Sequence, residues 1–418
     1  MFTKKWIAGF FFLVLLVSIA SGAVSMCDAK AEKLVTITFA PQKDITPATR
    51  EIIAAFEKKY PNIKVNFQEL PSGSDQTHNT YVTALTAGDS SVDVLQIDIV
   101  WPAEFAAAGW LLPLNSRLPK TEQKKFLPGP IQAVTFNGKI YAVPRWTDSG
   151  LLYYRKDIVK TPPKTWDELI QMCKENIGKN GIKNGFVFQG NQYEGFVCNI
   201  LEFIYGNGGS IINGKKVTVN SPQVIQALQY MKDIIGQNLT PPGITTYKEN
   251  ETVVVFQQGG TLFMRSWTNA WALLNKEESL VKGNVGVAPL PIGKNGKESS
   301  PTLGGWNMGI NRYSKHPDEA WKFIQFVTGE EGQKIAALTG GRLPTRKALY
   351  EDKDIVAKNP FWKDFYNAFS TAKPRPVSPV YPKISDTMQI NFHKAVNGLI
   401  PIKEAVLNVE KDLRQIVK

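Results

Sequence analysis

The chain is poor in the residues that metal centres and many catalytic sites require. Its 418 residues include only three histidines and three cysteines. His78, His316 and His393 stand far apart, and none has a second ligand at the spacing of a zinc site. The nucleophile motif G-x-S-x-G and a complete phosphate-binding or dinucleotide-binding glycine loop are also missing. We therefore predict no metal, no cofactor and no enzymatic activity.

Long basic runs are missing as well. Lysine and arginine total 49 against 37 acidic residues, a formal net charge of +12, yet no basic run exceeds two residues. Such a spread is typical of a solvated surface and predicts no nucleic-acid partner. Hydrophobic residues make up 43% of the chain, which excludes a disordered or collagen-like protein. The length predicts two or three domains.

Only one long apolar run occurs, at residues 6–20, after Lys4 and Lys5 and before a group of small residues. This order is typical of an export signal, with an uncleaved anchor helix as the alternative. Cys27 follows a lipobox-like stretch, which predicts lipidation and a signal at 1–26. The A-x-A pattern at 29–31 instead predicts cleavage after Ala31. Either way we expect an extracytoplasmic protein, as a membrane-anchored lipoprotein or a periplasmic or secreted form.

Strand and helix patterns alternate after the signal. Strands are predicted at 34–39, 63–67 and 92–100, with helices at 47–60 and 81–87 between them. This alternation predicts a parallel sheet covered by helices. A second α/β region begins near residue 150. Its expected strands lie at 252–256, 261–264 and 284–288, and helices dominate after residue 316, including one at 361–369.

Three local signals are sharper. Asn137-Gly138 between two short apolar runs predicts a hairpin. Thr165 and Ser221 are predicted helix caps, because each precedes a helical pattern. Cys173 and Cys198 fit either a disulfide or two buried thiols, and their spacing leaves both readings open.

Aromatic residues stand beside polar ones at predicted strand ends. In open α/β sheets, ligands bind beyond the carboxyl ends of the strands. An indole ring covers the apolar face of a sugar, and carboxylates, amides and guanidinium groups match its hydroxyls. The pattern therefore predicts a neutral carbohydrate site. It involves Asp98 and Trp101, Trp146 and Asp148, Trp267 with Asn269 and Trp271, and Trp306 with Asn307.

Six stretches, at 93–101, 109–114, 141–157, 163–169, 286–291 and 320–324, resemble the extracytoplasmic solute-binding proteins of ABC sugar importers (family 1, carbohydrate-binding). The likeness is greatest to the trehalose/maltose-binding branch. It implies a two-lobed α/β periplasmic-binding-protein fold, type II and maltose-binding-protein-like, with the ligand cleft between the lobes. The expected hinge is crossed three times, near 145–150, 289–293 and 340–343. The N-terminal lobe would hold 32–146 and 293–340, and the C-terminal lobe 147–292 and 341–418.

The resemblance also implies ligand-binding residues. Asp98, Asp148, Trp267, Trp306 and Arg342 match ligand positions of the branch, whereas Asn269 stands where trehalose-binding members carry a second aromatic. The complete expected set is Gln42, Lys43, Asp98, Trp101, Trp146, Asp148, Gln192, Glu194, Trp267, Asn269, Trp271, Gly305, Trp306, Asn307 and Arg342.

The leading prediction is a monomeric protein that binds a trehalose- or maltose-like disaccharide or short oligosaccharide and delivers it to permease subunits. Two alternatives remain. The basic net charge allows an acidic sugar, for which Lys43, Arg145 and Arg342 would matter more. A secreted carbohydrate-active enzyme would need a carboxylate pair, for which Asp98, Asp148 and Glu194 are the candidates.

Overall fold

The structure is a computed structural model that describes residues 33–214, 216–358, 362, 365, 369 and 371–417. The predicted export signal (1–26, or to 31) and Cys27 lie outside the described residues. So does most of the helix predicted at 361–369.

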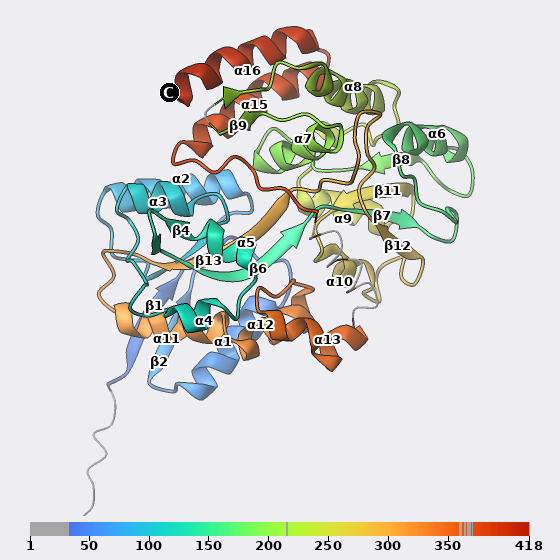
Figure 1. The fold of residues 1–418 in the computed structure, drawn as a ribbon. Coiled ribbons are helices and arrows are strands. Elements are labelled where there is room, and N and C mark those ends of the chain that lie inside the picture. Colours follow the sequence, from blue (N-terminus) through green and yellow to red (C-terminus); the bar gives the residue numbers. More distant parts are fainter. Residues whose placement is uncertain are drawn as a thin grey trace, which may run out of the picture. The chain divides into compact units, whose positions relative to one another are not determined.

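The first sheet has the strand order β2-β1-β3-β13-β6 (Figure 1). Its strands are β1 (Val35–Phe39), β2 (Ile63–Phe67), β3 (Val94–Asp98), β6 (Val143–Ser149) and β13 (Leu303–Ile310). The first three are parallel and are connected by α1 (Ala48–Lys59) and α2 (Ser74–Thr86), which confirms the predicted β-α-β-α-β opening. β13 runs antiparallel between β3 and β6. Helix α1 buries Ile52 and Phe56 in the core, and Phe56 meets α11 (Pro317–Val327) through Phe323.

The second sheet has the order β12-β7-β11-β8. Its strands are β7 (Leu151–Arg155), β8 (Asn184–Val187), β11 (Thr261–Ser266) and β12 (Val285–Ala288). Beside it lie α6 (Trp166–Asn176), α7 (Glu194–Gly206), α8 (Pro222–Gly236), α15 (Tyr381–Val396) and α16 (Ile402–Ile416) (Figure 1). Helix α7 is buried on nearly every side, because α8 and α15 both pack on it. These two layered units agree with the expected two-lobed α/β fold.

Local capping and turn signals are confirmed. Thr165 and Glu168 form a reciprocal capping box at the start of α6, and Ser221 accepts a hydrogen bond from the Val224 amide at the start of α8. Asn137 and Gly138 both have positive φ angles, 48° and 72°. They join β4 (Thr135–Phe136) to β5 (Lys139–Ile140) in the turn geometry that suits right-handed strand twist.

The remaining elements are short. They are α3 (Pro102–Ala107), α4 (Lys120–Gln123), α5 (Pro128–Ala133), β9 (Ile212–Asn213), β10 (Lys216–Val217), α9 (Glu249–Gln257), α10 (Ala270–Leu274), α12 (Glu330–Gly340), α13 (Lys353–Lys358) and two 3-10 turns, Ile244–Thr246 and Lys347–Glu351. Among the described residues, no helix combines the length and the apolar content that a membrane span needs.

Two sequence predictions of secondary structure are wrong. The run 252–256 is not a strand but the middle of α9, where Val253 and Phe256 are buried and Val254 is exposed. This spacing of three residues fits a helix face, and the Glu251 carboxylate caps the helix by accepting from the Lys248 amide at 3.0 Å. The helix predicted at 81–87 begins earlier, at Ser74.

The chain passes between the two units three times. The first passage is at Gly150, between β6 and β7, and the second lies between β12 and β13. For the third, predicted at 340–343, the contacts favour a later position, because Thr345 binds Gln333 of α12 and α13 packs on the same helix. We place it near Lys373, which pairs with Thr302 before α15 begins.

The contacts of two segments near the predicted lobe boundaries show which unit each one packs on. Residues 293–302 contact α7, since the Gly293 amide donates to the Gly206 carbonyl and the Thr302 hydroxyl to the Cys198 carbonyl. Residues 343–358 contact helices of the first sheet instead. The disulfide alternative is settled, because Cys173 and Cys198 are both free, buried thiols.

Candidate ligand-binding site

A cavity of about 230 Å³ is lined by residues of both units. From the first unit come the loop after β1, the end of β3, and strands β6 and β13. From the second come the start of α7, the start of α9 and the segment after β11. Eleven of the fifteen predicted residues line it, namely Gln42, Lys43, Asp98, Trp146, Asp148, Glu194, Trp267, Asn269, Gly305, Trp306 and Arg342.

The register of β13 brings the central residues together. Trp306 lies opposite Asp98 of β3 on one side and Trp146 of β6 on the other, and Gly304 lies opposite Asp148. Gly305 has a φ of 142°, and a Cβ there would stand 2.7 Å from the Trp146 carbonyl oxygen. Only glycine fits this close approach of the two strands.

Four predicted residues lie outside the cavity. Trp101 is buried between Phe105 and the edge of Trp306, with ring centres 5.9 and 5.5 Å away, so it supports Trp306 from behind. Asn307 follows Trp306 in β13 and is buried, with its amide 3.4 Å from the Ile97 carbonyl. Gln192 is exposed, and Trp271 lies on α10.

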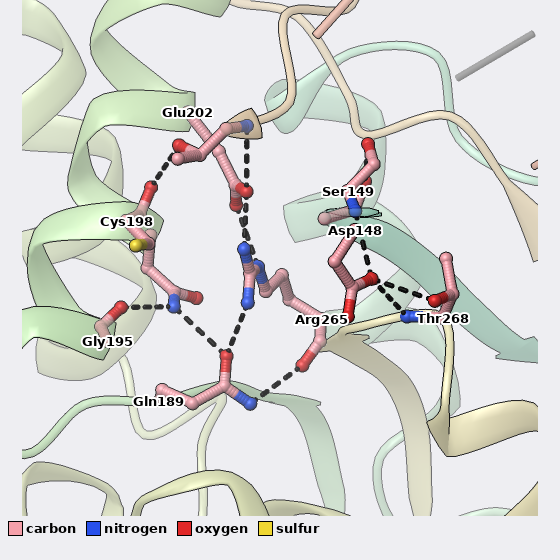
Figure 2. Close-up of polar contacts among 11 residues, drawn as sticks. Asp148, Ser149, Gln189, Gly195, Cys198, Glu202, Arg265 and Thr268 are labelled. Carbon is pink, nitrogen blue, oxygen red and sulfur yellow. Dashed lines mark hydrogen bonds and ion pairs between the residues drawn. The ribbon is translucent and has the colours of Figure 1, made fainter. Parts of the chain in front are cut away.

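Asp148 is held by three donors that all reach the same oxygen. Its Oδ1 accepts from the Ser149 amide (2.9 Å), the Thr268 amide (3.0 Å) and the Thr268 hydroxyl (2.8 Å) (Figure 2). Burial raises the pKa of this carboxyl, while the Thr268 bonds and the charge of Arg342 act against the rise. The three donors hold the carboxylate through Oδ1 alone and do not use Oδ2.

Arg375 is a central residue that the sequence prediction missed. It is 3% exposed, and its two terminal nitrogens contact Asp98 Oδ1 at 2.6 Å and Glu194 Oε1 at 2.7 Å. It therefore ties the end of β3 to the start of α7. The hydroxyls of Tyr381 and Ser385 also donate to Glu194.

The pKa of the Glu194 carboxyl is raised to about 7. Burial is the largest cause and the charge of Asp75 adds to it, while Arg375, Ser385 and Tyr381 oppose the rise. The Glu194 amide donates to the Asp75 carboxylate of α2 at 3.1 Å. This contact is a second link between the two units at the cavity.

A second arginine cluster lies under the loop after β1. Arg342 contacts Asp44 at 3.3 Å, and Asp44 also accepts from the hydroxyls of Thr46 and Thr49. Burial alone would raise the pKa of Asp44. The Arg342 charge and these hydrogen bonds outweigh burial and lower it to about 2.

Three tryptophans line the cavity in different ways. The guanidinium carbons of Arg145 and Arg342 lie 4.4 and 4.6 Å from the ring centre of Trp146. These two side chains cover Trp146, which is only 6% exposed, and this argues against the predicted role of stacking on a ligand. Trp267 and Trp306 are half-buried, so part of each ring faces the cavity.

Comparison with known proteins decides the family. The family model described as bacterial extracellular solute-binding protein matches residues 41–334, which is more than half of the chain. The chain belongs to this family. A probable ABC transporter-binding protein of Deinococcus radiodurans is 39% identical to the solute-binding chain over 365 residues, 84% of this chain and 85% of the relative.

Other relatives have named ligands. The structure of maltose-bound MalE3 of T. maritima superposes with a TM-score of 0.87 at 40% identity, over 91% of this chain and 99% of that one. A maltotriose-binding protein of Pyrococcus abyssi is 27% identical over 80% of this chain and 72% of its own length. The recognition made from the sequence is thus confirmed at the level of the family.

The cavity has further lining residues that the sequence prediction missed. Besides Arg375 and Asp44 they are Ile45, Ser72, Ser74, Gln96, Tyr193, Gly195, Cys198, Lys248, Glu249, Asn250, Glu251 and Gly304. Residues 248–251 were missed because the sequence predicts a strand at 252–256. In the structure they form the start of α9, which lines the cavity. Arg375 lies in a Pro-rich stretch that carries no periodic signal.

The lining of the cavity contains more carboxyl groups than cationic side chains. Its carboxylates are Asp44, Asp98, Asp148, Glu194, Glu249 and Glu251, and its cations are Lys43, Lys248, Arg342 and Arg375. The arginines are already paired with carboxylates. Within the described part of the chain, no group of three or more His, Cys, Asp or Glu side chains has the arrangement of a metal site.

Proposed function

We propose that this chain is the binding component of an ABC sugar importer and holds a neutral disaccharide or short oligosaccharide without covalent change. The observation that carries the proposal is the meeting of two half-buried indoles, Trp267 and Trp306, with the fixed carboxylate of Asp148 in one cavity. Stacking holds the apolar faces of sugar rings, and charge-assisted hydrogen bonds hold the hydroxyls. The maltose and maltotriose ligands of two relatives support a glucoside.

In this proposal, Glu194 and Asp98 hold the side chain of Arg375 in position. The remaining Arg375 donors and Asp98 Oδ2 would face ligand hydroxyls, and Gln42, Lys43 and Asn269 would supply neutral or cationic partners at the rim. Lobe closure around the ligand would then present a new surface to the permease. We further propose export, lipidation at Cys27 and a monomeric state.

The acidic-sugar alternative is disfavoured by the lining. The carboxyl groups of the lining outnumber its cations even when Glu194 is protonated, and the two arginines already have carboxylate partners, so the lining disfavours an anionic ligand. The enzyme alternative is disfavoured by the same pairing. Both Glu194 oxygens accept from protein donors, so Glu194 is not free to act on a glycosidic oxygen, and Asp98 Oδ1 is held by the same Arg375.

The test is calorimetry of the purified protein with maltose, trehalose, maltotriose and galacturonate, with leucine as a non-sugar control. We expect stoichiometric binding of at least one neutral glucoside, no binding of leucine, and a raised melting temperature with the bound sugar. Incubation with the same sugars should release no reducing ends. Binding of galacturonate alone, or release of glucose, would replace the proposal by one of the alternatives.

A further inference from the structure

Near the cavity, but not part of its lining, lies a buried ion pair. Arg265 of β11 is 1% exposed and Glu202 of α7 is 3% exposed. The Arg265 Nε donates to Glu202 Oε2 at 2.8 Å, and Nη2 donates to Oε1 (Figure 2). The third side of the guanidinium donates to Gln189 Oε1 at 2.9 Å, and Gln189 also accepts from Asn199. The guanidinium is therefore fixed in its plane.

Stability alone does not account for such a pair. Removing two charges from water is costly, and well-packed apolar side chains of similar volume are often at least as stable in their place. The contacts of the pair on its two other sides point to another role.

The first of these contacts is with Trp267. The guanidinium carbon of Arg265 lies 4.0 Å from the centre of the Trp267 ring, a stacking distance. A Cβ added at Gly304 would stand 2.8 Å from the same ring, so β13 closes in on it as well. Arg265 covers part of the indole and holds its plane, while the rest of the ring lines the cavity.

The second contact is with the passages between the two units. A Cβ at Gly150 would lie 2.1 Å from Glu202 Oε1 and 2.7 Å from Arg265 Nη2. The Thr302 amide donates to the same Glu202 oxygen at 3.2 Å, and Thr302 pairs with Lys373. All three passages therefore touch the ion pair directly or through one residue.

We propose that the Arg265–Glu202 pair is a positioning element that couples the hinge to the Trp267 ring, so that lobe closure sets the indole against the ligand. This inference rests on the proposed sugar-binding function. Arg265 and Glu202 touch no ligand in it. They act through Trp267 and through the backbone at Gly150 and Thr302.

The test removes both charges together. The double variant R265M/E202Q leaves no unpaired buried charge, and the amide oxygen introduced by E202Q can still accept from Thr302. The single variant R265K keeps the charge but loses the flat guanidinium face. As a matched control, R414M/E410Q removes an exposed ion pair of α16 by the same exchanges. Each protein is also made with W267F, so that the emission of Trp267 is obtained by difference.

We expect the double variant to fold, to bind maltose about tenfold more weakly, and to show a changed Trp267 emission without ligand. R265K should behave in the same way, because a charge without the flat face does not hold the ring. The surface control should match the wild type in both measurements. A merely structural pair would change the melting temperature while affinity and Trp267 emission stayed as in the wild type.

Wild-type affinity and wild-type Trp267 emission in the folded double variant would overturn the proposal. Should that variant not fold, the same result in R265K would overturn it. If the wild-type protein bound no sugar, the proposed function would fall, and Trp267 emission alone would still decide whether Arg265 positions the ring.

Discussion

Asp148→Asn separates the two tasks that we assign to this carboxylate. The amide oxygen of asparagine can take the place of Oδ1 and accept from the Ser149 amide and from both Thr268 donors. The amide nitrogen then replaces Oδ2 on the side of the cavity. Stability should change little, because the three buried donors keep an acceptor and a buried charge is removed.

The exchange should weaken ligand binding more than it lowers the stability of the fold. A hydrogen bond to a charged group contributes about 1.5–3 kcal/mol and a neutral one about 0.5–1.5 kcal/mol, so the exchange should cost about 1.4 kcal/mol of binding, or about tenfold in Kd. Asp148→Ala should behave differently. It leaves three buried donors without their acceptor, at about 1–3 kcal/mol each, so both stability and affinity should fall.

The assay is maltose calorimetry together with denaturant unfolding of both variants. Asp318→Asn on α11 serves as a control, since its side chain is 75% exposed and lies outside the cavity. Unchanged maltose affinity in Asp148→Asn would refute the assignment of Oδ2 to the ligand. Equal stability of the asparagine and alanine variants would refute the anchoring role of Oδ1.

Three further predictions use other residues. Trp306→Ala should weaken maltose binding by about 2 kcal/mol or more, about thirtyfold, in calorimetry, because it removes a half-buried ring from the cavity. Gly150→Ala should lower the free energy of unfolding by about 1–3 kcal/mol in urea, because the new methyl group meets Glu202, and unaltered stability would contradict that contact. The raised pKa of Glu194, about 7, means that the folded state holds a proton which the unfolded state has lost, so its contribution to stability should fall as pH rises from about 4.5 to 7. Urea titrations across that range should show a flatter profile for Glu194→Gln, and identical profiles would show that Glu194 does not titrate there.

The sequence predicts best what depends on neighbouring residues. The Thr165 cap and the Asn137-Gly138 turn are fixed within a few residues, so both were found. Trp306 and Asp148, which the aromatic and polar pattern predicts for the site, both line the cavity. Trp306 lies within β13 and not at a strand end, and its place beside β6 depends on the register of β13.

What the sequence does not reveal depends on distant partners. Residues 252–255 are β-branched and favour a strand in isolation, but burial of Val253 and Phe256 selects a helix. Arg375 has no local signal, and its role appears only when Asp98 and Glu194 are brought to it from positions 277 and 181 residues away.

The place of β13 in the first sheet has a consequence for the order in which the protein is made. β13 is contributed by residues 303–310, yet it separates β3 from β6, which the ribosome completes much earlier. The ion pairs of Asp98 and Glu194 form later still, because Arg375 is synthesised after β13. A chain stopped before residue 303 would have a gap in its first sheet, and one stopped before 375 would have two carboxylates without their cation. The cavity is therefore complete only in a chain that includes residues 303–310 and Arg375, and we expect a product truncated before them not to bind the proposed sugar.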